Sequence, residues 1–310
     1  MDRGKLNSNL LLLITSTIWG FGFVAQEMGS DHLGPNAFNG TRYSVGVVCL
    51  LIILLLWHRG RAMDGFRSRD WVKASLSAGL FLFFGSLLQQ AGIGYEATGP
   101  GKAGFITGLY VVIVPLLGLT LGHRTNAQMW AGVALATVGL WLLSFNLGNE
   151  QWAIRRGDLL VFFGAFCWAA HVLVIDRFAN RVSSLHLALG QVTVCAGASW
   201  VASALAEPME WASFRAAFLP ALYLGSMSIA VAFTMQIIGQ RKAHPTHASI
   251  IFAMEAVVGV FAGWLILHEQ LTQRELAGCL LMFCGMVLSQ LPVRLIRLGL
   301  TRRANDKPPA

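Results

Sequence analysis

Charged residues are scarce in this sequence. Of 310 residues only 12% are charged, whereas 55% are hydrophobic. Soluble domains carry about 25% charged residues, and a compact body this apolar would expose large hydrophobic patches to water. Disordered, collagen-like and coiled-coil chains are excluded as well, because each requires polar or repetitive sequence. The composition therefore predicts an integral membrane protein.

Nucleotide and metal motifs are also lacking. The chain holds no Walker A sequence, and His268-Glu269 lacks the second histidine of the zinc-protease pattern. The five cysteines are odd in number, lie in apolar stretches and show no ligand spacing, so we expect small buried side chains rather than disulfides or ligands. We expect no cofactor and no metal.

Long hydrophobic runs fill the rest of the chain. A membrane span needs about 20 mostly apolar residues to cross about 30 Å of hydrocarbon. Ten stretches meet this requirement and are separated by short connections. The predicted spans are 9–28, 37–57, 71–93, 101–121, 127–146, 158–177, 185–206, 216–238, 246–268 and 273–292. We expect an all-α integral membrane fold in the lipid bilayer.

The positive charges indicate the orientation. With the N-terminus inside, 17 of the 23 Lys and Arg residues face the cytoplasm, and six, including Arg155 and Arg156, face outward. Because cytoplasmic loops are enriched in Lys and Arg, we expect a multi-pass protein of the cell (inner) membrane with both termini cytoplasmic. The net charge of +8 is then explained by topology, and no nucleic-acid partner is expected.

The two halves of the sequence resemble each other. Leu11–Gly20 matches Leu160–Ala169 at a shift of 149, and Ala103–Arg124 aligns without gaps to Ala248–Glu269 at a shift of 145. Each copy holds five predicted spans, and since five is odd, the second copy is inverted. We therefore predict two five-helix repeats, 1–148 and 149–293, and a basic tail, 294–310. Inverted repeats are typical of transporters with a midplane site, although duplication could also have built only a scaffold.

Several motifs carry a resemblance to a known family. They are Ile18-Trp19-Gly20, Phe38–Tyr43, Ala97–Phe105, Met254–Val257, and Glu269–Thr272 with Gly278 and Gly285. On these residues the sequence resembles the EamA family of the drug/metabolite transporter superfamily over roughly residues 9–292. One departure is Ala256, where many members have proline, so the kink expected in that helix is in question.

The resemblance implies ten helices, export of small metabolites, and a path lined by helices 1–4 and 6–9 with helices 5 and 10 at the periphery. Amino-acid exporters, aromatic ones among them, are known in this family. The glycine pairs Gly132/Gly139 and Gly278/Gly285 offer faces for a possible homodimer.

Glu255 is the clearest ionisable residue at membrane depth. It lies about nine residues into the ninth span, between Ile250 and Val258. Ionisable groups in hydrocarbon are costly, so they need a partner, a water path or a function. Glu255 could bind a substrate amine or carry a coupling proton, or it could be a structural carboxylate bonded to neighbouring helices.

The other candidates for substrate binding or coupling each have a structural alternative. Arg42 could attract a substrate carboxylate, snorkel to the interface or pair with Glu27. The polar residues could line the path or bond across helices, and the deeper aromatic residues could stack against a substrate or only pack. The polar residues are Gln89, Gln90, His171 and Gln236, and the aromatic ones are Trp19, Tyr110 and Trp168.

These patterns predict a secondary transporter of small molecules, an exporter of amino acids or similar amphipathic compounds that alternates access to a midplane cavity. The alternative is a membrane-embedded enzyme acting on a lipid or peptide, which would require a converging pair such as His171 with Glu255. We expect a transporter and no enzymatic activity.

Overall fold

The computed structural model describes residues 3–57, 68–94, 100–144, 155–208, 210–266 and 270–290. Within these ranges the regular elements are all helices, so the predicted fold class is confirmed at the level of an all-α protein. The predicted boundary at 148/149 and the predicted basic tail at 294–310 lie outside the described residues.

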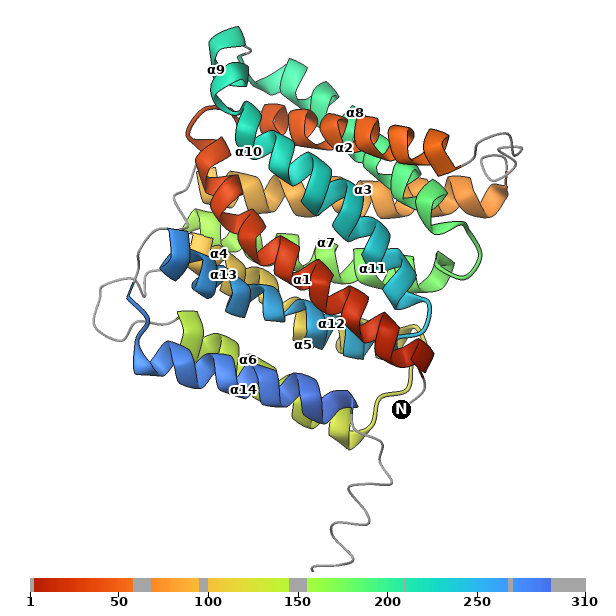
Figure 1. Ribbon diagram of the computed structural model, residues 1–310, viewed down its shortest axis with the longest axis vertical. Helices are drawn as coiled ribbons and strands as arrows, with labels where there is room; N and C mark the ends of the chain where they lie inside the picture. Colours follow the sequence, from red (N-terminus) through yellow and green to blue (C-terminus); the bar gives the residue numbers. More distant parts are fainter. Residues whose placement is uncertain are drawn as a thin grey trace, which may run out of the picture.

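The helical segments follow one another through short connections (Figure 1). Their bounds are α1 Arg3–Ser30, α2 Pro35–Trp57, α3 Arg69–Gly94, α4 Pro100–Gly108, α5 Tyr110–Thr120, α6 Ala127–Ser144, α7 Arg156–Phe178, α8 Ser184–Ala206, α9 Trp211–Ala216, α10 Phe218–Tyr223, the π-helix η2 Leu224–Ala232, α11 Phe233–Gln240, α12 Pro245–Phe252, α13 Met254–Ile266 and α14 Gln273–Gln290.

Eight of the ten predicted spans correspond to helices that are long and apolar enough to cross a membrane. Three of the eight are composite, because α4 continues into α5, α10 continues through η2 into α11, and α12 continues into α13. The predicted spans 127–146 and 273–292 correspond to α6, whose apolar part is shorter, and to α14, whose first turn carries Arg274 and Glu275.

The outside of the bundle is apolar. Side chains such as Leu55, Phe163, Val201 and Leu280 are more than half exposed. Large exposed apolar side chains of this kind suit hydrocarbon rather than water.

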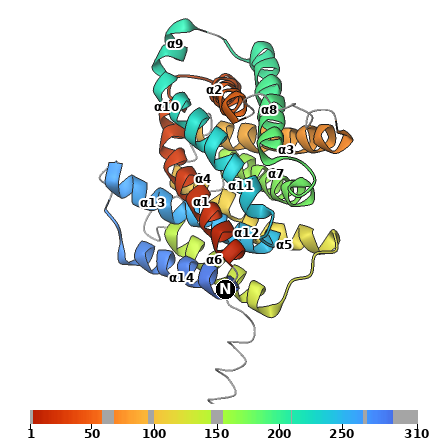
Figure 2. The ribbon, with the colours of Figure 1, turned by 45° about the vertical axis from the view of Figure 1, so that its right-hand side comes forward.

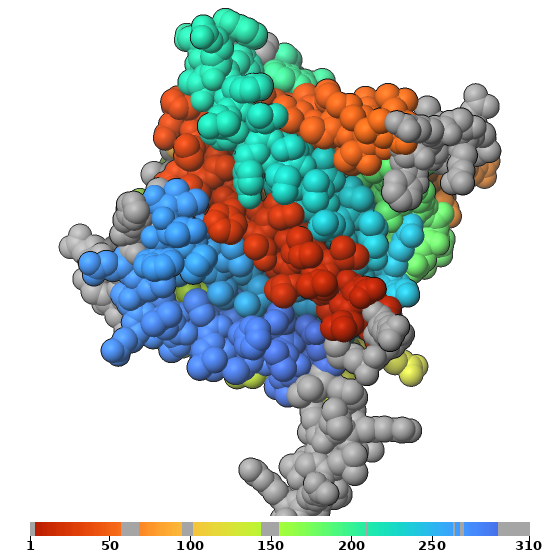
Figure 3. All heavy atoms as spheres, in the orientation of Figure 1, coloured from red at the N-terminus to blue at the C-terminus, as the bar shows by residue number. Residues whose placement is uncertain are grey.

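The helices pack in pairs that cross between the two predicted halves. α6 packs on α14 and α2 packs on α8, while α3 contacts both α7 and α8. In Figures 1 and 2 the α6–α14 pair lies at one end of the molecule, as the resemblance implies for helices 5 and 10. Figure 3 shows α1 crossing the face between α10–α11 and α13, both of which it contacts.

Glycines allow α6 and α14 to approach closely. A Cβ atom on Gly139 would lie 2.6 Å from the carbonyl oxygen of Gly278, and a Cβ on Gly285 would lie 2.7 Å from that of Gly132. These four glycines are therefore buried against each other within one chain and do not present a face to a second copy. Association into a homodimer stays a prediction.

Two composite helices are interrupted near their middles. One breaks at Leu109, between α4 and α5, and the other at Ala253, between α12 and α13. In the ungapped alignment Leu109 matches Met254, so the two breaks fall within one residue of each other. The second break occurs although residue 256 is alanine, so the helix is interrupted here without a proline.

Two large apolar clusters meet at the centre. One joins side chains of α5, α6, α7, α12 and α14, and the other joins those of α2, α3, α8 and α11. Trp19 on α1 and Trp168 on α7 pack against both clusters. The two tryptophans therefore mark the place where the cores come together.

Candidate functional site

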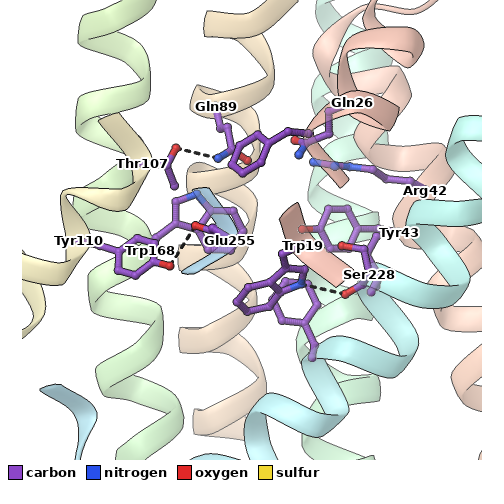
Figure 4. Close-up of a pocket in the computed structure, with 13 residues that line it drawn as sticks. Trp19, Gln26, Arg42, Tyr43, Gln89, Thr107, Tyr110, Trp168, Ser228 and Glu255 are labelled. Atoms are coloured by element: carbon purple, nitrogen blue, oxygen red, sulfur yellow. Dashed lines mark hydrogen bonds between the residues drawn. The ribbon is translucent and has the colours of Figure 1, made fainter. Parts of the chain in front are cut away.

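A pocket lies at this central junction, where α1, α2, α3, α4, α5, α7, η2, α11 and α13 converge (Figure 4). Its lining mixes polar, charged and aromatic side chains. They are Trp19, Phe23, Gln26, Arg42, Tyr43, Gln89, Thr107, Tyr110, Trp168, Ser228, Ile229, Phe233 and Glu255. Of the helices that the resemblance implies for the path, helices 1–4, 6, 8 and 9 contribute lining residues, whereas helix 7, which is α8, contributes none.

Six of the nine candidate residues line this pocket. They are Trp19, Arg42, Gln89, Tyr110, Trp168 and Glu255. The other three, Gln90, His171 and Gln236, are buried outside the lining.

Glu255 lies in the first turn of α13, directly after the break at Ala253. Its Oε1 accepts a hydrogen bond of 3.0 Å from the Tyr110 hydroxyl, and the side chain is buried. The Tyr110 hydroxyl thus gives the buried carboxyl a polar partner while leaving it in the pocket wall.

Arg42 is buried in the pocket wall, which excludes snorkelling to the interface. Its Nε donates to Asn39 Oδ1 at 2.9 Å, and its guanidinium lies 5.6 Å from the ring centroid of Phe38 and 5.4 Å from that of Tyr43. Cation–π contacts and one amide hold the positive charge in place. The arrangement leaves guanidinium N–H groups for a further acceptor.

Amide side chains form the upper part of the pocket in Figure 4. Gln89 Nε2 donates to Thr107 Oγ1 at 2.8 Å, joining α3 to α4. Gln90 points away from the lining and donates to the Gln26 carbonyl at 3.1 Å. This hydrogen bond joins α3 to α1, which is the kind of contact that the structural alternative describes.

Aromatic rings close the lower part of the pocket. The ring centroid of Trp19 lies 5.2 Å from that of Phe233 and 5.3 Å from that of Phe252. Trp168 stacks on Phe233 at 6.4 Å with an interplanar angle of 14°. We call Trp19, Trp168 and Phe233 the aromatic layer.

His171 and Glu255 have different partners. His171 Nε2 lies 2.9 Å from Gln191 Oε1, whereas Glu255 bonds to Tyr110. The converging pair that the enzyme alternative required is thus not formed. Within the described part of the chain, no cluster of His, Cys, Asp and Glu could hold a metal ion, and the five cysteines are free.

Several lining residues are not among the candidates predicted from the sequence. Gln26 follows Trp19 by seven residues, a spacing that puts both on one helix face, and this signal was available. Tyr43 adjoins Arg42 and bonds Ser86 at 2.6 Å. Thr107, Ser228 and the apolar residues carry no sequence signal of their own, since they reach the pocket only through tertiary packing.

Comparisons with known proteins identify the family of this chain. The EamA-like transporter family matches residues 6–145 and again residues 155–291. An uncharacterized transporter, YoaV, of Bacillus subtilis is 25% identical over 90% of this chain and 94% of its own length. A probable amino-acid metabolite efflux pump of Escherichia coli is 21% identical over 92% of this chain and 95% of its own.

Two further matches bear on the fold and the family. The aromatic amino acid exporter YddG of Escherichia coli is 27% identical over 60% of this chain and 64% of its own length. A solved crystal structure superposes with a TM-score of 0.77 at 19% identity, covering 93% of this chain and 98% of that one. The two family matches together span most of the sequence. The chain is therefore a multi-pass membrane protein that belongs to the EamA-like transporter family.

Proposed function

We propose that this chain is a secondary transporter that exports amino acids or similar amphipathic compounds by alternating access to the central pocket. One observation carries the proposal. The pocket brings a buried carboxyl, Glu255, and a buried guanidinium, Arg42, to opposite walls beside an aromatic layer. Each charged group is held by a neutral partner, Tyr110 or Asn39.

A zwitterionic amino acid fits these groups by charge. Its carboxylate would accept hydrogen bonds from the Arg42 guanidinium, a donor suited to two-pronged recognition. Its ammonium would approach Glu255, and its side chain would stack on Trp19 or Trp168. Trp168 lines the pocket with an indole N–H that has no protein partner, so it can also donate to a substrate.

Relatives support the substrate class. Two proteins of Escherichia coli that resemble this chain are named for amino-acid metabolite efflux and for aromatic amino acid export. The rings of the aromatic layer favour amphipathic or aromatic side chains over small polar ones.

Alternating access is supported by the relation between the predicted halves, 1–148 and 149–293. The two breaks fall within one residue of each other in the internal alignment, and two of the close helix pairs, α6–α14 and α2–α8, join corresponding helices of the two halves. Rocking of two similar halves around a midplane site exposes it to each side in turn. The 17 to 6 distribution of positive charges supports cytoplasmic termini in the inner membrane.

The energy source would be an ion gradient, or the transporter would be a facilitator. A proton carried by Glu255 is the simplest coupling, because a carboxyl can change its charge within the pocket. Competition between this proton and a substrate ammonium for the same carboxyl would link the two fluxes.

Flux measurements in proteoliposomes test the proposal. The purified full chain would be assayed with radiolabelled phenylalanine, tryptophan, leucine and glutamate, with and without an imposed pH gradient. We expect saturable flux of the aromatic amino acids that a pH gradient accelerates. Saturable flux of none of the four would reject the amino-acid assignment, and turnover of a substrate without net movement would indicate the enzyme alternative.

A further inference from the structure

Three buried polar side chains lie on the other side of the aromatic layer from Arg42 and Gln89. His171, Gln191 and Gln236 are at most 1% exposed. His171 follows Trp168 by three residues along α7, and Gln236 follows Phe233 by three residues along α11. Both therefore lie one turn beyond the layer, toward the helix ends that we assign to the cytoplasm. The pocket amides lie above the layer (Figure 4).

These three side chains have unsatisfied hydrogen-bonding atoms. His171 and Gln191 bond to each other at 2.9 Å, but His171 Nδ1 and Gln191 Nε2 have no partner. Gln236 is fully buried with neither its Oε1 nor its Nε2 bonded. Buried polar groups are nearly always hydrogen-bonded, so each exception needs an explanation.

Gln236 of α11 faces α7, the helix that carries His171. Phe233, Gln236 and Gln240 follow the i, i+3, i+7 spacing of one helix face. Phe233 contacts the His171 ring at 5.7 Å between centroids, and Gln240 Nε2 donates to the Val172 carbonyl at 2.9 Å. Since both flanking residues touch α7 at positions 171 and 172, Gln236 lies against α7 between them.

The internal alignment relates this set to the pocket. The shift of 149 that relates Leu11–Gly20 to the second half matches Arg42 to Gln191. Gln89 and Gln90 lie between the segments aligned at shifts of 149 and 145, and intermediate shifts of 147 and 146 match them to Gln236. In an inverted repeat, equivalent residues lie on opposite sides of the midplane. The set thus corresponds to the polar part of the pocket, reflected to the other side of the aromatic layer.

We propose that His171, Gln191 and Gln236 form a second polar subsite, which receives the substrate carboxylate when the transporter opens to the cytoplasm. The two unbonded amide N–H groups are donors, and a carboxylate oxygen is the acceptor they lack. This inference rests on the proposed function and extends it. The substrate carboxylate passes from one set of donors to the other as the aromatic layer opens.

Transport kinetics measured separately from each face test the subsite. In right-side-out and inside-out vesicles, Gln236→Leu should raise the KM for phenylalanine about tenfold or more when substrate is offered on the cytoplasmic face. The outer KM should stay within about twofold, and the melting temperature should be equal to or above that of the wild type. Gln89→Leu is the matched control and should show the opposite asymmetry.

Equal KM changes on both faces, unchanged KM on both, or a lowered melting temperature with unchanged kinetics would overturn the subsite. If the wild type carries no phenylalanine, the substrate assignment fails, and a second measurement tests the subsite independently. Gln236→Cys, in the full chain with its five native cysteines replaced, should react with a membrane-impermeant thiol reagent from the cytoplasmic face alone. No reaction from either face, or reaction from the outer face, would reject it.

Discussion

The hydroxyl of Tyr110 donates a 3.0 Å hydrogen bond to Glu255 Oε1, and the two residues hold equivalent positions in the internal alignment. Tyr110 is the first residue of α5, and Glu255 is the second residue of α13. Each thus follows the break in its composite helix. The pair joins the two predicted halves at the pocket. A change in the charge of Glu255 would therefore alter a contact that both halves share.

Replacing the carboxyl tests whether this contact belongs to the transport mechanism. Glu255→Gln keeps the size of the side chain and an acceptor for the Tyr110 hydroxyl, but it can neither carry a proton nor attract an ammonium by charge. We expect folding and membrane insertion to be retained and transport in proteoliposomes to fall by at least about tenfold, the rate loss for about 1.4 kcal/mol of barrier.

Tyr110→Phe serves as the control for the hydrogen bond itself. It removes the hydroxyl but leaves the carboxyl, so we expect a smaller loss of transport than in Glu255→Gln. Normal flux through Glu255→Gln would remove this carboxyl from the mechanism, and a lowered melting temperature with unchanged flux would identify a structural residue.

Substitution of Arg42 tests recognition of the substrate carboxylate. Arg42→Lys keeps the positive charge but loses the planar, two-pronged donor set. We expect the KM for an amino acid to rise in Arg42→Lys and to rise further in Arg42→Gln. In the wild type we expect a lower KM for phenylalanine than for phenethylamine, an amine that lacks the carboxylate. In Arg42→Gln the two KM values should become similar. An unchanged preference between the two compounds would contradict the role of Arg42.

Histidines gather at the end of the molecule that we assign to the cytoplasm. The ring centroid of His244 lies 5.8 Å from that of His123 and 6.0 Å from that of His247, and His123 pairs with Asp176 at 3.6 Å. His244 Nδ1 also caps α12 by accepting from the Thr246 backbone at 3.2 Å. Burial and then the neighbouring His123 lower the pKa of His244 from 6.5, against a hydrogen bond with the Arg124 backbone.

A lowered pKa means that the folded state favours neutral His244. The stabilisation is therefore present above pH 6.5 and is lost as the pH falls through the lowered pKa. His244→Asn retains a capping side chain without this titration, so its melting temperature should fall less than that of the wild type between about pH 7.5 and 5.5. His244→Ala should also be less stable at the higher pH, since it removes the cap. Parallel pH profiles for wild type and His244→Asn would show that His244 does not contribute.

Hydrophobic length and helix periodicity made the spans predictable, and Glu255 and Arg42 were recognisable because charge at membrane depth is costly. The sequence could not show that α12–α13 breaks at Ala253, since no proline or glycine adjoins that residue. The break of α4–α5 at Leu109 directly follows Gly108, but many other glycines lie inside unbroken helices. Nor could the sequence separate Gln89 from Gln90. One lines the pocket and the other bonds to α1, and only the rotation of α3 against its neighbours decides between them.

Close packing of α6 on α14 gives a prediction about stability that is independent of transport. A Cβ on Gly139 would lie 2.6 Å from the backbone oxygen of Gly278, which cannot move aside as a flexible side chain could. Gly139→Leu should therefore force the helices apart and cost on the order of 1–3 kcal/mol. Gly197→Leu is the matched control, because no atom lies within 4 Å of the Cβ position and the site is exposed. We expect Gly139→Leu to lower the melting temperature in detergent and Gly197→Leu to leave it unchanged.

Equal effects of the two substitutions would mean that the added bulk destabilises a helix wherever it is placed. The contact between Gly139 and Gly278 would then not limit the approach of α6 to α14.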